Sequence, residues 1–480
     1  MEIFLIIASP IIAAFLSFAC KRRPIIEAAS IIASLASFVF SIFIALEVAS
    51  SGHYTPSEYF SVDALGAIIL MTVSLVGLAS SFYSRGYLRE ETSKQIIGFS
   101  RVKQYFVLFN LFLAAMFFAI TTTNPIIMWI SIEATTLSTA FLISFYNKPS
   151  ALEAAWKYLI INSIGLLLGF LGTLLYFTSI KSTDGHSLIN WSDLLSNAQN
   201  LDPFIAKIAF IFILIGYGTK IGFSPMHTWK PDAYSKAPTP IAALFSGALL
   251  NVAFLAVLKF KLITDLAIGH QFSQKLLIVF GILSIVVAAL IIFIQKNYKR
   301  LLAYSSIEHA GIIALGFAFG GLGSFAAILH MIYHSLVKSA LFFSAGNIFL
   351  KYSSTKITTV KGAISAIPTT SVLFLAGLIA ITGVPPFGLF LTKTYILSEG
   401  IKTHPLLTVV ALFSFIIIFI GFLRHATAMI FGDKPEETIK TKENNWLVLP
   451  IIVLMIVAFY LSFNLPPFIN TLINSAASNY

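Results

Sequence analysis

The feature that most constrains this chain is a series of apolar runs that recur along nearly its whole length. About fourteen of them approach the roughly 20 residues that an α-helix needs to cross the hydrocarbon of a bilayer. Of the 480 residues, 58% are hydrophobic and 11% are charged, which is too little charge to cover a globular surface in water. The sequence predicts an all-α polytopic membrane protein of about fourteen transmembrane helices. The runs lie at about residues 2–20, 25–48, 62–83, 105–122, 125–146, 155–180, 204–224, 240–258, 276–294, 301–319, 325–350, 370–398, 405–431 and 446–464.

The remaining composition excludes several classes of function. Cys20 is the single cysteine, so an internal disulfide or an iron–sulfur cluster held by this chain alone is excluded. The net charge of +11 comes from residues dispersed over short loops, whereas nucleic-acid binding needs a basic stripe or motif. The start, "MEIFLIIASP", lacks a basic region before the apolar run, which favours a first membrane span over a cleaved signal peptide.

The distribution of lysine and arginine predicts an orientation. When the spans are threaded through a membrane, the loops on one side, such as 84–103 and 432–445, hold most of the basic residues, with Lys230 and Lys299 counted among them. The positive-inside rule places that side in the cytoplasm. We therefore expect a multi-pass protein of the cell inner membrane with both termini outside.

Four ionisable residues lie inside predicted spans, namely Glu133, Lys220, Lys338 and Lys393. Each costs at least about 2.5 to 3.5 kcal/mol near the bilayer centre, so each is by default a functional candidate. The alternatives are snorkelling side chains for the lysines and a structural ion pair for the acid. We expect Glu133 and Lys220 to pair across neighbouring spans, because each is otherwise an unpaired charge in hydrocarbon.

Glycine and proline interrupt two of the spans, the seventh and the twelfth. The interrupting residues are Gly218, Gly222 and Pro225 around Lys220, and Gly383, Pro385 and Pro386 before Lys393. Broken helices five spans apart indicate two inverted five-helix repeats. Within one membrane domain of residues 1–480, we expect a three-helix segment (1–103), a first repeat (104–262), a second repeat (263–431) and a last loop and helix (432–480).

A stripe of titratable groups crosses the run "ILHMIYHSLVKSALFF". Steps of four place His330, His334 and Lys338 on one face of a helix. Histidine, and lysine kept from water, can exchange protons reversibly near neutral pH. We favour a proton relay, with His227, His309 and Lys299 as further stations; a metal pair at His330 and His334, or purely structural histidines, are the alternatives.

Several strings carry a family resemblance: "WISIEATTLSTAFLISFY", "EAAWKYLIINSIG", "GTKIGFSPMHTWKPDAYSKAPTPIAAL", "NYKRLLAYSSIEHAG", "HMIYHSLVKSALFFSAGNIFLKY" and "GVPPFGLFLTK". Over most of its length the chain resembles the antiporter-like subunits of respiratory complex I, of Mrp-type cation/proton antiporters and of energy-converting membrane hydrogenases. Within that superfamily it is most similar to component F of the hydrogenase-4 or formate hydrogenlyase group.

This resemblance implies two half-channels joined by a hydrophilic axis, with Glu133, Lys220, Lys338 and Lys393 as the translocating residues. It also implies that the chain carries no cofactor, and that iron–sulfur clusters and a NiFe site or other redox centres lie in partner subunits of a hydrogenase or NADH dehydrogenase-type complex. One departure is that the eighth span offers Ser246 and Asn251 where some relatives have histidine. Alternative functions are an Mrp-type antiporter subunit, a stand-alone secondary transporter and a structural membrane scaffold.

Overall fold

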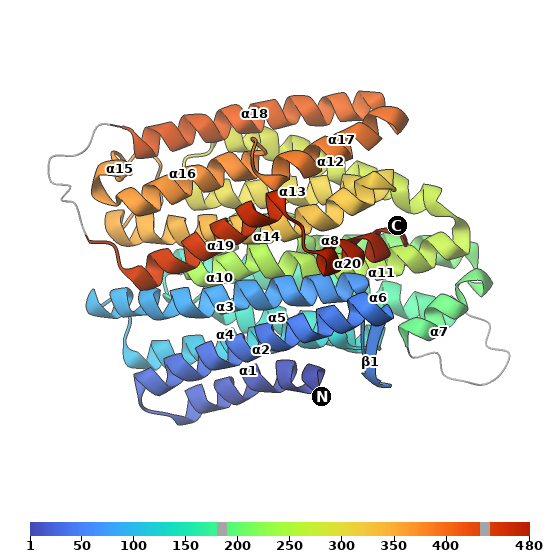
Figure 1. The fold of residues 1–480 in the computed structure, drawn as a ribbon, viewed down its shortest axis with the longest axis horizontal. Helices are drawn as coiled ribbons and strands as arrows, with labels where there is room; N and C mark the ends of the chain where they lie inside the picture. The colour runs from blue at the N-terminus through green and yellow to red at the C-terminus, as the bar shows by residue number, and fades with distance from the viewer. Residues whose placement is uncertain (180–189, 433–441) are drawn as a thin grey trace.

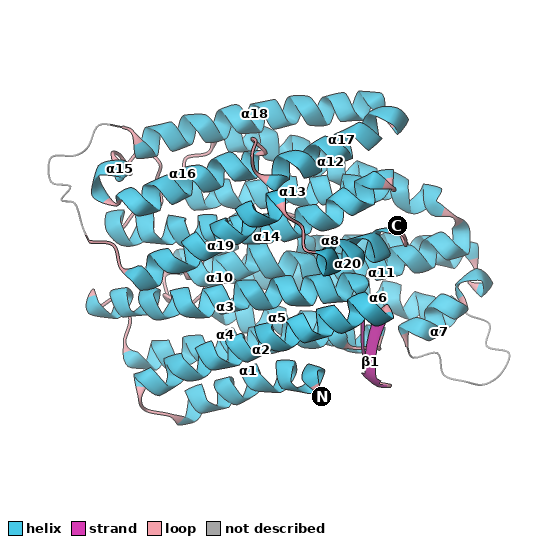
Figure 2. Ribbon diagram, viewed as in Figure 1, coloured by secondary structure: helices cyan, strands magenta, loops and turns pink. Residues whose placement is uncertain are grey.

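The structure, a computed structural model, describes residues 1–179, 190–432 and 442–480. It is a bundle of roughly parallel and antiparallel helices, and within the described residues its single sheet is a two-stranded hairpin (Figures 1 and 2). Thirteen helices of the described chain are long and apolar enough to span a membrane. The predicted all-α membrane fold is therefore confirmed.

The first part of the bundle leads into a broken helix. Its elements are α1 (Glu2–Ala19), α2 (Arg23–Ser51), β1 (His53–Ser57), β2 (Phe60–Asp63), α3 (Ala64–Ser93), α4 (Phe99–Thr121), α5 (Pro125–Ile143), α6 (Pro149–Ser179), α7 (Trp191–Ser196), η1 (Ala198–Asn200), α8 (Pro203–Ile221) and α9 (Trp229–Lys236). The following span consists of α10 (Thr239–Leu244), a π-helical turn η2 (Phe245–Leu249) and α11 (Leu250–Ile268).

The second part contains the other broken helix. Its elements are α12 (His270–Ile294), α13 (Tyr298–Phe319), α14 (Leu322–Tyr352), α15 (Ala363–Ala366), α16 (Pro368–Thr382), α17 (Gly388–Thr403), α18 (Pro405–Ile430), α19 (Asn445–Phe463) and α20 (Pro467–Ala477). The predicted span 370–398 is thus formed by two shorter helices, α16 and α17. The predicted starts of the two repeats, residues 104 and 263, lie inside α4 and α11. The division into two repeats stays a prediction.

Short polar residues start several of these helices. The side chains of Asp63, Asn124, Asp202 and Asn297 each accept a backbone N–H in the first turn of α3, α5, α8 and α13. Such caps satisfy amide groups that have no partner inside the helix. They fix where each span begins, so polar side chains further along each helix reach a defined depth.

The centre of the bundle is formed by α13, α14 and the α10–α11 span, which are almost wholly buried. Peripheral helices such as α1, α2 and α18 expose large apolar side chains instead. This is the arrangement expected of a membrane bundle, in which polar groups face the interior. Figure 1 shows α13 and α14 running through the middle of the molecule.

The two chain termini lie at the same end of the bundle. The terminal amine of Met1 donates to the hydroxyl of Tyr54 in β1. Tyr480 lines a small cavity with Asp63, which pairs with His53 across the hairpin. Two termini at the same end agree with an even number of membrane crossings. That this end lies outside the cytoplasm stays a prediction.

Candidate functional site

The first broken helix is closed by a left-handed glycine. α8 ends at Ile221, and Gly222 follows with φ +85°. Gly218, which we predicted to be part of the break, lies inside α8, and its carbonyl accepts the bonds that close the helix. Pro225 lies in the non-helical segment before Trp229. The predicted interruption exists, but it begins one turn after Gly218.

Lys220 lies in the last turn of α8 and is buried. Its ammonium donates to the hydroxyl of Thr136 at 2.8 Å and to that of Tyr158 at 2.9 Å. Thr136 in turn donates to the carboxylate of Glu133 at 3.1 Å, and Ser163 donates to the other oxygen at 2.9 Å. The expected direct ion pair is therefore wrong: within the described chain, a hydroxyl separates the ammonium from the carboxylate.

A second lysine occupies the same break. Lys230 is 1% exposed, although we had counted it among the loop residues. Its ammonium donates to the carbonyl of Ile221 at 2.6 Å, and its side chain lies directly over Gly222. A cation is stabilised there because the last carbonyls of a helix carry partial negative charge. Sequence reasoning missed this residue because the polar string "HTWKPD" resembles a loop.

The second broken helix repeats this construction. α16 ends at Thr382, Gly383 follows with φ +81°, and Pro385 and Pro386 lie in the gap before α17, as predicted. Lys393 donates to the carbonyl of Thr382 at 3.1 Å, and its side chain lies over Gly383. Lys393 therefore corresponds in position to Lys230, and not to Lys220 as the paired breaks had suggested.

Lys393 also forms a direct ion pair. Its ammonium donates to Glu308 of α13 at 3.0 Å, and both side chains are buried. Ser305 donates to the other carboxylate oxygen at 3.4 Å. We had not singled out Glu308, although a signal existed: "SIE" occurs at both Ser131–Glu133 and Ser306–Glu308. The second occurrence lies in the middle of the predicted span 301–319.

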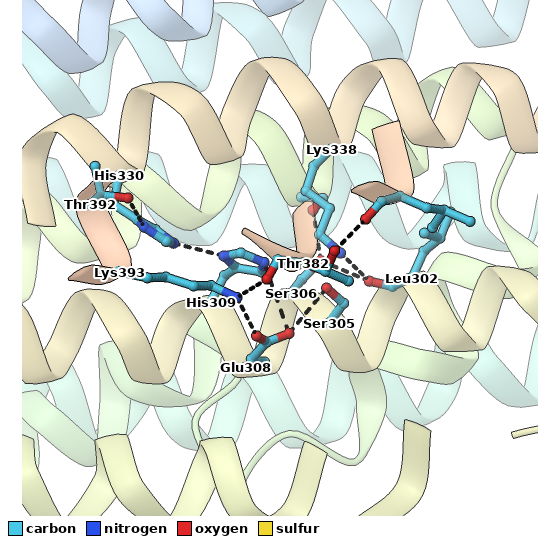
Figure 3. Close-up of polar contacts among 12 residues, drawn as sticks. Leu302, Ser305, Ser306, Glu308, His309, His330, Lys338, Thr382, Thr392 and Lys393 are labelled. Carbon is cyan, nitrogen blue, oxygen red and sulfur yellow. Dashed lines mark hydrogen bonds and ion pairs between the residues drawn. The ribbon is translucent and has the colours of Figure 1, made fainter. Parts of the chain in front are cut away.

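Three buried histidines, His309, His330 and His334, extend this pair toward the centre of the bundle; Figure 3 shows the first two. His309 Nδ1 lies 2.7 Å from His330 Nε2, and His330 Nδ1 lies 2.8 Å from the hydroxyl of Thr392. The ring of His334 lies 4.8 Å from that of His309, centroid to centroid. Both ring nitrogens of His334 are buried, and neither has a partner at ordinary hydrogen-bond geometry among the described residues.

Lys338 lies at the centre of the molecule. It is fully buried, and its ammonium donates to the carbonyl of Leu302 in α13 at 2.7 Å (Figure 3). It forms no salt bridge with any residue that the structure describes, so a neutral carbonyl holds its ammonium. A buried ammonium in such surroundings is destabilised as a charge, which makes it suited to releasing a proton.

The two polar residues predicted in the eighth span both contact the central helices. Ser246, in the π-helical turn η2, shares a hydrogen bond of 2.7 Å with Ser306 of α13. The Asn251 side chain donates to Ser335 of α14 at 2.8 Å. Such π-turns occur often at functional sites. Through Ser246, this one contacts α13, the helix that carries His309.

The remaining predicted relay residues, His227 and Lys299, lie beside the line of buried titratable groups. His227 lies in the first break with its ring 6.1 Å from that of Tyr304 on α13. Lys299 is 3% exposed, in contrast to its predicted place in a loop, and donates to the Thr239 hydroxyl at 2.9 Å. Both therefore face the interior between the two halves.

The described residues hold no group of three His, Cys, Asp or Glu side chains that could bind a metal ion. His330 uses both ring nitrogens in contacts with His309 and Thr392, which leaves the proposed His330–His334 metal pair without support from this geometry. The arrangement is instead a line of buried ammonium, imidazole, hydroxyl and carboxylate groups. Such groups can accept and release protons.

Comparison with known proteins agrees with this geometry. Residues 122–421 match the family model described as the NADH:quinone oxidoreductase/Mrp antiporter transmembrane family. A "Hydrogenase-4 component F homolog" of Methylacidiphilum infernorum is 35% identical over 437 residues, which is 90% of each chain.

Two solved structures share the whole fold. A chain of the membrane-bound sulfane sulfur reductase, an archaeal respiratory membrane complex, is 24% identical with a TM-score of 0.87, and the match covers 100% of this chain and 98% of that one. A chain of the Mrp complex from Dietzia sp. DQ12-45-1b is 19% identical with a TM-score of 0.86, over 100% and 97% of the two chains. The resemblance read from the sequence is confirmed: this chain belongs to the NADH:quinone oxidoreductase/Mrp antiporter transmembrane family, as an antiporter-like membrane subunit.

Proposed function

We propose that this subunit translocates protons along the buried line of titratable groups that runs from Glu133 to Lys393. The observation that carries the proposal is the burial of that line from Lys220 to Lys393 in the centre of the bundle, on α8, α9, α13, α14 and α17, with the half-buried Glu133 of α5 at its start. The groups in order are Glu133, Lys220, Lys230, Lys338, His334, His309, His330, Glu308 and Lys393. Several charges inside hydrocarbon have a high cost, which a scaffold without ion transport has no reason to carry.

The chemistry of the line favours protons over sodium. Ammonium and imidazolium groups are hydrogen-bond donors, whereas a sodium ion without its water needs several oxygen ligands. The two carboxylates, Glu133 and Glu308, lie on different helices and each has hydrogen-bonded neighbours already. Steps between stations pass through hydroxyls such as Thr136 and Thr392, or through water.

We further propose that the chain works in a membrane-bound hydrogenase-type complex in the cell inner membrane. The support is its similarity to a relative named as a hydrogenase-4 component F homolog. With one cysteine, the chain itself has no thiolate set for an iron–sulfur cluster, so iron–sulfur clusters and a NiFe site would lie in partner subunits. Redox energy would reach this subunit through them. The competing assignment is an Mrp-type antiporter subunit.

Translocation by the intact complex in proteoliposomes tests the proposal. Lys338→Ala should abolish acidification of the vesicle lumen while the partner subunits still turn over, and Lys402→Ala should pump normally because Lys402 is an exposed residue paired with Glu399. Pumping should persist in sodium-free medium and collapse with a protonophore. Normal pumping by Lys338→Ala, or an absolute need for sodium, would contradict the proton line.

Purification decides between the two kinds of complex. A complex that contains nickel and iron and oxidises or produces H₂ supports the hydrogenase assignment. A complex without redox metals that exchanges Na⁺ for H⁺ favours the antiporter assignment.

A further inference from the structure

A buried carboxylate lies at the end of the bundle that carries most of the basic loops. Glu91 is 0% exposed in the last turn of α3. One oxygen accepts a hydrogen bond of 2.5 Å from the hydroxyl of Tyr146, and the other is buried without a hydrogen-bond partner in the structure. The predicted span ended at residue 83, so this glutamate had been placed in a loop.

A neighbouring glutamate shows how a structural carboxylate is held at this end. Glu27, in the first turns of α2, is also buried, and three arginines surround it: Arg23 at 2.8 Å, Arg85 at 3.5 Å and Arg89 at 2.6 Å. Glu91 forms no ion pair with any residue that the structure describes. A buried carboxylate without a counter-charge has a high cost as an anion, so Glu91 is suited to taking up a proton.

A chain of hydroxyl groups leads inward from Glu91. The hydroxyl of Tyr146, a partly exposed residue, lies 3.2 Å from that of Tyr87 on α3. Tyr87 precedes Glu91 by one turn of α3, and α3 packs against α10, which carries Thr239. Thr239 accepts a hydrogen bond of 2.9 Å from the ammonium of Lys299. Apart from Tyr146, these residues are buried.

This hydroxyl chain ends at Lys299, one helical turn from the carbonyl that holds the central lysine. Lys299 lies in the first turn of α13, and Leu302 follows it by three residues, one helical turn. The carbonyl of Leu302 accepts the ammonium of Lys338 at 2.7 Å (Figure 3). Lys299 therefore lies one turn from the middle of the proposed proton line.

We propose that Glu91 is the intake site through which protons from the basic-loop side reach Lys338. The inference rests on the proposed function and names a residue that the function itself does not require. The step begins with Lys299 as the neutral amine, after it has given up the proton of the preceding cycle. A proton binds the Glu91 carboxylate, each hydroxyl of Tyr146, Tyr87 and Thr239 accepts one proton and releases another, and the amine of Lys299 becomes an ammonium. Lys299 then passes its proton to Lys338, and Glu91 returns to the carboxylate.

The surroundings of Glu91 leave few other groups for this role. The other titratable groups that interact electrostatically with it are Lys148, in the loop after α5, and Tyr83 of α3 and Tyr105 of α4, which its charge reaches. The hydroxyl of Tyr105 is bonded to that of Ser84, and the hydroxyl of Tyr83 donates to Asn347. Within this group of titratable residues, the carboxylate is that of Glu91.

The test compares Glu91→Gln with Glu90→Gln in the intact complex in proteoliposomes. Glu91→Gln keeps the shape but has no acidic group, so proton translocation per redox turnover should fall about tenfold or more. Glu90 is a partly exposed neighbour, so Glu90→Gln should pump normally. Glu91→Asp should recover part of the rate. In infrared difference spectra, a carboxylic-acid band should be absent in Glu91→Gln and present in Glu90→Gln.

The outcomes separate this inference from the proposed function. If Glu91→Gln pumps normally while Lys338→Ala does not, the intake site is overturned and the proton line stands. If neither variant loses pumping, the proton line itself fails. Loss of assembled complex in Glu91→Gln with no recovery in Glu91→Asp would show a structural role and overturn the inference. An assembled Glu91→Gln complex whose infrared difference spectrum is unchanged would overturn it as well.

Discussion

The two broken helices use one backbone construction and hold different charge arrangements on it. In each, a left-handed glycine ends the first half-helix, at Gly222 and at Gly383. In each, a lysine from the second half-helix crosses that glycine and donates to the last helical carbonyl, Lys230 in one and Lys393 in the other. We infer that this lysine is the repeated element of the two halves.

The difference lies in the distance between lysine and carboxylate. In the second half, Lys393 contacts Glu308 directly at 3.0 Å. The first half adds Lys220, whose counterpart two residues before Gly383 is the apolar Ile381. Its ammonium reaches Glu133 through the hydroxyl of Thr136. The second half is therefore a closed ion pair, whereas the first is an open pair with a proton-conducting group between its charges.

The largest expected effect is on stability, from breaking the closed pair. Glu308→Gln leaves the ammonium of Lys393 buried beside a neutral amide, and removing one partner of a buried ion pair costs about 3 to 5 kcal/mol. Glu133→Gln should cost about 1 kcal/mol or less, because Glu133 is only half-buried and has no direct cation partner. Unfolding of the purified complex in mixed detergent micelles measures both. Equal costs would remove the distinction between a closed and an open pair.

The large-scale fold could be predicted from the sequence because hydropathy reports spans directly. The predicted 125–146 and 301–319, for example, match α5 and α13 within three residues at each end. The break before Lys393 was also readable, because Gly383, Pro385 and Pro386 cannot continue a helix. The β-hairpin at His53–Asp63 was not read, since its polar residues between two spans resemble any short loop.

The site was less readable because its geometry depends on how helices pack. Nothing in the local sequence fixes the register of α5 against α8 that inserts Thr136 between Glu133 and Lys220. Lys230 and Glu91 were assigned to loops because polar residues near a helix end have the same composition whether they face water or turn inward. Glu308 is different: the repeated "SIE" string was available as a signal and was not used.

The next effect is on rate, from removing the group between the charges of the open pair. Thr136→Val keeps the volume of the side chain but has no hydroxyl, so Lys220 and Glu133 lose their connection. Proton translocation should slow about tenfold or more, with a smaller change in stability than Glu308→Gln causes. Thr135→Val is the matched control, because Thr135 is also buried on α5 and its hydroxyl donates to the backbone carbonyl of Ile132. Equal rates for the two variants would mean that protons pass Lys220 by another route.

The smallest expected effect tests whether the shared construction is real. A Cβ on Gly222 would lie 2.7 Å from the Lys230 side chain, and one on Gly383 would lie 2.9 Å from that of Lys393. Gly222→Ala and Gly383→Ala should each cost about 1 to 2 kcal/mol because an L-residue is strained at positive φ. The second should also slow translocation, since Lys393 must keep its contact with Glu308 while its stem is displaced. Gly98→Ala, with open space around it and a negative φ, is the control. If all three variants unfold and pump alike, the lysines do not cap the two half-helices.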